Sequence, residues 1–165
     1  MGNSIHEHLA SHLSMMGMPL TDNLVDILKE NFSQDEAKIV MMLPSTDTPL
    51  KPVAVKALAE SSDMDQTYLS NVLEDLLKRK LIFSGKTKDG EKGYALHHPG
   101  FGFPQSFFWG GKKSPYALKM SNLVLKYFNR SVTKEAFGGR NTKAYRYIPI
   151  HKALKHEIQA VLLHE

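Results

Sequence analysis

The stretch DQTYLSNVLEDLLKRKLIFS, residues 65–84, contains the strongest structural signal in the chain. It opens with Asp65, a residue type that caps helices, and its apolar residues then recur at three- and four-residue intervals. These positions are Tyr68, Leu69, Val72, Leu73, Leu76 and Leu77. Such spacing predicts a helix with one apolar side. The apolar residues 81–83 predict a strand that follows the helix directly.

The residues on either side extend this pattern into a recognisable unit. Downstream, Asp89-Gly90 predicts a hairpin turn, and residues 93–96 predict the returning strand. Upstream, residues 61–64 predict a tight turn, preceded by a helix with Val53, Leu58 and Ala59 as core candidates. The order of helix, turn, helix and two-stranded wing is typical of a winged helix-turn-helix.

An earlier helix completes the unit, and two flanking segments surround it. Ser33 and Glu36 form a capping-box pattern that predicts a helix ending at Pro44. We therefore expect a winged helix-turn-helix at residues 33–98, an N-terminal helical arm at 1–32 and an extension at 99–165. The extension should hold an aromatic and glycine-rich loop, a helix opening at Ser114-Pro115, and a strand at 144–150. The predicted class is mostly α with small β (α+β), packed as one compact unit.

Composition excludes several kinds of chemistry. The chain has no cysteine, so these residues offer no disulfide, thiolate metal site or cysteine-held iron–sulfur cluster. No phosphate-binding glycine loop or nucleophile motif is found, so we expect no enzyme activity from this chain alone. Neither a signal peptide nor an apolar run long enough to span a bilayer is visible, which predicts a cytoplasmic location.

Charge is distributed unevenly along the chain. Residues 1–33 carry one lysine against four carboxylates, and residues 34–98 carry nine basic against ten acidic side chains. Residues 99–165 carry eleven basic against three acidic side chains, a net charge of +8. The positive surface is therefore expected on the C-terminal third and not on the winged helix.

The winged helix itself raises the possibility of DNA binding. In such a reader, exposed residues near the start of the long helix contact base edges and the wing contacts phosphate. Those positions here are Gln66, Thr67, Ser70, Asn71, Lys86 and Lys88. Asp65, Glu74 and Asp75 lie on the same helix, and the unit is net negative, which disfavours a phosphate-binding role. The alternative is a winged helix used for packing or docking.

The eight histidines suggest metal binding, but no complete ligand set accompanies them. His8 and His12 are four residues apart and would share a helical face, as two zinc ligands must. No carboxylate is placed to complete a site, and the His-Glu-x-x-His pattern is absent. We therefore expect solvent-facing histidines and no metal or other cofactor in this chain.

The aromatic segment after the wing has two interpretations. Its rings could cover the winged helix and join it to the C-terminal helix, or they could form an exposed docking patch with nearby basic residues. The possible docking surface comprises Phe107, Phe108, Trp109, Lys112, Lys113 and Arg146. Lys119, Lys126 and Arg130 on the following helix could also meet an acidic partner.

Several motifs together resemble a known family. They are FSQDEA at 32–37, LAE at 58–60, LEDLLKRKLIF at 73–83, PGFGF at 99–103, LKYF at 125–128 and TKAYRYIPI at 142–150. These motifs are similar to the N-terminal winged-helix region of multidomain ferredoxin-like [4Fe-4S] proteins of bacteria and archaea. In that family the Arg-x-Ile-Pro strand, here at Arg146, precedes a linker, a helix and the cysteine-rich part.

The resemblance implies a role but not a cofactor in these residues. It predicts a non-catalytic module for interdomain or protein–protein docking, whose partner is an iron–sulfur domain in cis or a redox partner protein. The [4Fe-4S] clusters are expected only in a longer parent protein, because no cluster ligand is present here. The alternative function is a winged-helix DNA-binding transcription regulator. No membrane partner is expected.

Overall fold

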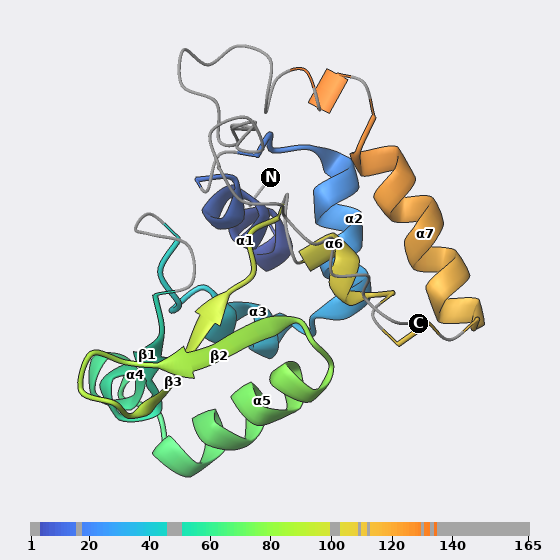
Figure 1. Ribbon diagram of the computed structural model, residues 1–165. Coiled ribbons are helices and arrows are strands. Elements are labelled where there is room, and N and C mark those ends of the chain that lie inside the picture. Colours follow the sequence, from blue (N-terminus) through green and yellow to red (C-terminus); the bar gives the residue numbers. More distant parts are fainter. Residues whose placement is uncertain are drawn as a thin grey trace, which may run out of the picture.

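The computed structural model describes residues 4–15, 18–45, 51–99, 103–108, 110–111, 113–129, 131–132 and 134. The chain begins with three helices, α1 (Ile5–Ser14), α2 (Asp22–Asn31) and α3 (Gln34–Val40). The helices start at Ser4, Thr21 and Ser33, whose hydroxyl oxygens each accept a first-turn amide. Helix α1 contacts both α2 and α3, so the N-terminal arm is part of the core (Figure 1).

The capping box predicted for α3 is present, but the helix ends earlier than expected. The Ser33 amide donates to Glu36, and the Glu36 amide donates to the Ser33 hydroxyl. The helix ends at Val40, and Met42 and Leu43 donate to carbonyls three residues back. Because this tighter turn satisfies the last carbonyls, the helix ends before Pro44 is reached.

The winged-helix unit contains one more strand than the sequence predicts. Its elements run α3, β1 (Val53–Ala54), α4 (Val55–Ser62), α5 (Gln66–Lys78), β2 (Ile82–Lys86) and β3 (Lys92–Leu96). They form a three-stranded antiparallel sheet in the order β1-β3-β2. Val53 therefore belongs to a strand opposite Tyr94, and its assignment to the following helix was wrong. This is the element order of a winged helix-turn-helix in a mostly α protein with small β.

Helix α5 supplies the centre of the core. Leu69, Leu73 and Leu76 have no exposed surface, and Val72 is half-buried. The buried positions recur at three- and four-residue intervals, as the sequence predicts. Tyr68 was expected on the same side but is 44% exposed, because it lies at the margin of the apolar stripe.

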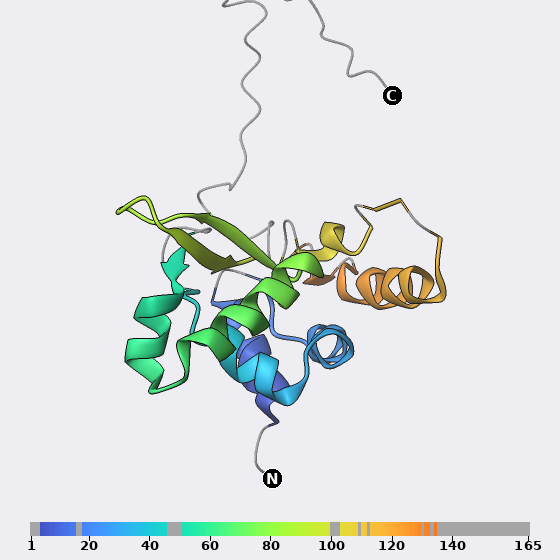
Figure 2. The same cartoon turned by 90° about the horizontal axis from the view of Figure 1, so that it is seen from below.

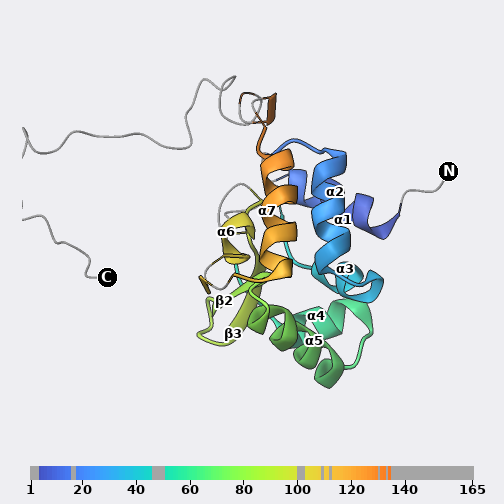
Figure 3. The same ribbon diagram turned by 90° about the vertical axis from the view of Figure 1, so that its right-hand side faces the viewer.

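The C-terminal extension adds α6 (Phe103–Ser106) and α7 (Pro115–Tyr127). Helix α7 starts as predicted, with Ser114 accepting the Ala117 amide and proline in the first turn. It runs beside α2, as Figures 1 and 3 show. The predicted strand at 144–150 lies outside the described residues.

A buried asparagine joins α2, α7 and the end of α5. Asn31 is 4% exposed, and its side chain donates to Ile27 and accepts from the Tyr116 hydroxyl. Its backbone carbonyl accepts from Arg79, which also contacts Glu36. These contacts hold the start of α7 against α2 and the end of α5.

The wing tip and α7 lie on opposite sides of the molecule (Figures 1 and 2). A ligand at one would therefore leave the other accessible. Among the described residues, no helix combines the length and the apolar character needed to cross a membrane.

Candidate functional site

The four polar residues predicted to contact DNA lie together on the outside of α5. Asp65 caps this helix by accepting the Tyr68 amide at 2.7 Å, which fixes where the first turn begins. Gln66, Thr67 and Asn71 are exposed and Ser70 is half-buried. Since the leucines of α5 occupy the opposite side, the polar residues are directed away from the core.

These residues line a concave surface, which we call the α5 hollow. It has a volume of about 630 Å³, and β3 forms its far wall. Its lining consists of Val55, Gln66, Thr67, Ser70, Asn71, Glu74, Lys92 and Tyr94. Its neutral polar members on α5 can both donate and accept hydrogen bonds, which is the chemistry needed to contact base edges.

Glu74 gives the α5 hollow an internal anion. Its carboxylate accepts hydrogen bonds from Lys92 and from the hydroxyl of Tyr94. The hydrogen bond from Lys92, followed by that from Tyr94, lowers the pKa of Glu74 below its ordinary value. Glu74 is therefore ionised at neutral pH, and Lys92 is already engaged by it. The sequence showed Glu74 on this helix but gave no sign of these partners.

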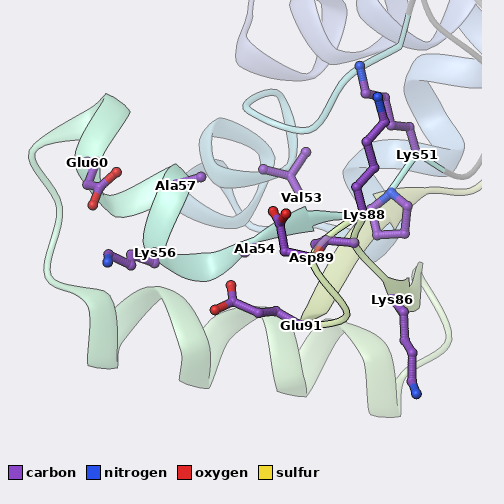
Figure 4. A pocket seen from close by; sticks show the side chains of 12 residues that line it. Lys51, Val53, Ala54, Lys56, Ala57, Glu60, Lys86, Lys88, Asp89 and Glu91 are labelled. Atoms are coloured by element: carbon purple, nitrogen blue, oxygen red, sulfur yellow. The ribbon is translucent and has the colours of Figure 1, made fainter.

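The predicted wing contacts are exposed but share their surroundings with carboxylates. Lys86 and Lys88 lie at the end of the β2–β3 hairpin, which turns through Gly90 at a φ of 82°. A hollow of about 740 Å³ separates this hairpin from the start of α4. Figure 4 shows Lys86 pointing away from Lys88, and Asp89 and Glu91 of the same hairpin also line the hollow. The wing therefore presents mixed charge instead of a continuous cationic surface.

The predicted aromatic docking surface divides into a packed part and an exposed part. Phe103 is buried, and Phe107 packs edge-to-face on it with ring centroids 5.1 Å apart. Phe107 also meets Tyr116 of α7 at 6.5 Å, so it joins the extension to the core and is not an exposed anchor. Phe108 is 39% exposed. Trp109, Lys112 and Arg146 lie outside the described residues.

Helix α7 exposes an apolar stripe that the sequence interpretation missed. Leu118 and Leu125 are 67% and 70% exposed, with Ser121 and Asn122 between them. We call these four residues the α7 outer face. The opposite side buries Met120 and Tyr127 against the core. The sequence contained a signal for this face. The two leucines are seven residues apart, which places them on one side of the helix, and this is not the side of the inward-facing Met120 and Tyr127.

A hollow of about 710 Å³ adjoins the α7 outer face. Its lining includes Phe108, Lys113, Pro115, Ala117, Leu118 and Ser121. This α7 hollow joins two members of the predicted docking surface, Phe108 and Lys113, to the leucines of the helix. The four lining residues Phe108, Pro115, Ala117 and Leu118 are apolar, so the hollow suits an apolar side chain better than a small charged ligand.

The histidines were predicted to face solvent; among those that the structure describes, His8 is exposed as predicted, whereas His6 is buried. His12 is half-buried; its Nε2 donates to the Leu43 carbonyl at 2.7 Å, and its Nδ1 shares a hydrogen bond of 3.2 Å with the Ser45 hydroxyl. His97 is also buried, and burial lowers its pKa. Within the part of the chain that the structure describes, no three His, Asp or Glu side chains gather as a metal site would require.

Comparison of the chain with family models, curated proteins and solved structures finds no match. Functional assignment therefore depends on the α5 hollow, the wing and the α7 outer face.

Proposed function

We propose that this chain is a non-catalytic docking module of a cytoplasmic iron–sulfur electron-transfer protein. Its α7 outer face contacts the cluster-bearing domain, either in cis or on a separate redox partner. The observation that carries this proposal is the exposure of Leu118 and Leu125 beside an apolar hollow. Exposed apolar residues of this kind, rimmed by polar groups, are typical of protein contact sites.

The resemblance of the chain to ferredoxin-like proteins supplies the nature of the partner. The α7 outer face comprises four residues of one helix, and electron-transfer encounters use small interfaces. The absence of cysteine is consistent with a supporting role, since a cluster would have to be held elsewhere.

A direct binding measurement tests this function. The full chain is titrated with a purified, cluster-loaded domain carrying two [4Fe-4S] clusters, and heat is recorded by calorimetry. We expect a dissociation constant on the order of micromolar, and we expect the affinity to fall as the salt concentration rises. An acidic protein of similar size without a cluster serves as the control. Equal binding to both proteins, or binding to neither, would contradict the proposal.

DNA binding is the second candidate, and one observation favours it. The α5 hollow brings together Gln66, Thr67, Ser70 and Asn71, all four of the side chains expected to contact bases. Asparagine and glutamine can bond an adenine edge through two hydrogen bonds. The carboxylate of Glu74 in the same hollow opposes binding of phosphate.

Selection from random DNA duplexes tests this candidate. A true base reader would enrich one motif, and Asn71→Ala would abolish that enrichment. Lys38→Ala is a matched control, because Lys38 is an exposed residue of α3 away from the α5 hollow. Recovery of sequences without a common motif would exclude sequence-specific regulation.

A further inference from the structure

The α7 outer face has the geometry of a helix-to-helix seam. Leu118 and Leu125 lie seven residues apart, which corresponds to about 10.5 Å along the helix and nearly two turns. Ser121 and Asn122 between them are smaller than leucine and leave room for side chains of a facing helix. Residues that recur at this spacing form the seam along which two helices pack.

The α7 hollow extends this seam at one end. Phe108 forms one wall and Leu118 another, while Ala117 and Ser121 contribute little volume. A large apolar side chain projecting from a facing helix can therefore enter beside Leu118 without displacing α7. Such insertion of one side chain into a gap between others is the usual contact in paired helices.

Charge distinguishes between the possible occupants. Residues 113–129 contain Lys113, Lys119 and Lys126 and no carboxylate. Lys119 contacts Glu30 of α2 at 2.5 Å, whereas Lys113 and Lys126 flank the two ends of the seam. A second copy of the chain would bring its own lysines close to these lysines, which is unfavourable. Residues 151–165 of the same chain are a second possible occupant, but they carry equal numbers of lysines and carboxylates. A facing helix with flanking carboxylates would match the charge best.

We propose that the α7 outer face binds an amphipathic helix of an acidic partner protein, with apolar side chains in the seam and carboxylates beside Lys113 and Lys126. This inference rests on the proposed docking function and adds the chemistry of the partner. It makes binding depend on both the leucines and the sign of the flanking charges.

Two synthetic peptides of about 18 residues serve as probes. Both place leucines at i, i+3, i+4 and i+7; one has glutamates beside the leucines and the other has lysines. Fluorescence anisotropy with the full chain should give a dissociation constant of about 10–100 μM for the glutamate peptide, in the range of weak recognition. The lysine peptide should bind at least tenfold more weakly.

Variants of the chain locate the contact. The double variant Leu118→Ser, Leu125→Ser should weaken glutamate-peptide binding at least tenfold. Both side chains are largely exposed, so this variant should retain the fold. Tyr68→Ser is the control, because Tyr68 is 44% exposed on α5 and belongs neither to the α7 outer face nor to the lining of the α7 hollow. Equal weakening by both variants, or no preference between peptides, would overturn the inference.

Two measurements separate the other occupants. Sedimentation that shows a dimer broken by the leucine substitutions would assign the face to a second copy. Peptide binding that emerges only after removal of residues 151–165 would assign it to the chain itself. Either result would overturn the inference. If the cluster-loaded domain binds the wild type and the double leucine variant equally well, the chain docks on that domain through another surface, and both the α7 contact and this inference fail. If the glutamate peptide binds through the leucines but the cluster-loaded domain does not bind, the face recognises an acidic helix and the iron–sulfur partner is wrong.

Discussion

The carboxylate of Glu74 lies between a lysine and a buried tyrosine, and its ionisation determines the electrostatics of the α5 hollow. Lys92 and Tyr94 both donate to it, and Lys92 also lies 5.4 Å from the centre of the Tyr94 ring. The Tyr94 side chain is only 2% exposed. The network therefore joins α5 to β3. It also pairs Lys92 with a carboxylate, so that Lys92 is less available to bind a phosphate group.

Replacing Glu74 by Gln should lower stability in a pH-dependent way. Its pKa is lowered in the folded chain from an ordinary value of about 4.5. The stabilisation is therefore complete above that value and is lost as the pH falls through the lowered pKa. At pH 7 we expect Glu74→Gln to cost about 0.5–1 kcal/mol, because the side chain is partly exposed.

Urea unfolding of both proteins from pH 7 down to about pH 3 measures this effect. The difference in unfolding free energy should narrow below about pH 4.5. Glu91→Gln, at an exposed position beside the hairpin turn, should stay within about 0.5 kcal/mol of the wild type throughout. A constant difference across the whole range would show that ionisation of Glu74 does not stabilise the fold.

Single residues also show where sequence reasoning reached its limit. The position of Glu74 on α5 follows from helical spacing, but its partners lie 18 and 20 residues away on β3. His12 is a second example. Its helix was predicted, but its hydrogen bond to the Leu43 carbonyl depends on how α1 packs against α3. Periodicity in the sequence identifies the face of a helix or strand on which a residue lies, but the residues that this face contacts depend on tertiary packing.

At the scale of elements, α5 offers the simplest test of the core. Leu73 has no exposed surface, so Leu73→Ala should lower the unfolding free energy by about 2–5 kcal/mol through lost burial and a residual cavity. Tyr68→Ala on the same helix should cost less than about 1 kcal/mol, since Tyr68 is 44% exposed. Chemical denaturation measures both. Near-wild-type stability of the leucine variant would mean that this side of α5 does not pack as described.

Strand β1 shows why short strands escape sequence analysis. It contains only Val53 and Ala54, and its identity depends on pairing with Tyr94 and Gly93 some 40 residues later. Two residues cannot display an alternating pattern, and the adjoining helix extends its own periodicity over them. The longer strands β2 and β3 were predicted because their apolar runs flank a clear turn signal at Gly90.

The close approach of β1 to β3 makes Gly93 intolerant of a side chain. A Cβ at this position would lie 2.9 Å from Pro52 Cβ and 3.0 Å from the Val53 carbonyl carbon. We therefore expect Gly93→Ala to cost about 1–3 kcal/mol in a denaturation experiment, because the strand must shift. Gly110→Ala is the control, since nothing lies within 4 Å of a Cβ there. Equal stability of the two variants would contradict the described pairing of β1.

At the scale of the whole molecule, the wing and α7 form two surfaces that differ in charge and in position. The wing combines Lys86 and Lys88 with Asp89 and Glu91, whereas α7 carries lysines without carboxylates. These surfaces lie on opposite sides of the molecule (Figure 2). The sequence predicted the excess charge of the C-terminal third, and the structure adds that part of it lies beside exposed leucines.

This separation predicts how the chain will behave with DNA. Affinity should be weak, indifferent to sequence and steeply reduced between about 50 and 200 mM salt, because counterion release would dominate it. Replacing Lys113 and Lys126 together by Gln should reduce the slope of log K against log salt by roughly 1.8, the contribution of two phosphate contacts. Replacing Lys86 and Lys88 by Gln removes the same charge from the wing and should change the slope less. Filter binding to random duplexes measures both slopes. A larger loss for the wing pair would place DNA on the winged helix and favour the regulator over the docking module.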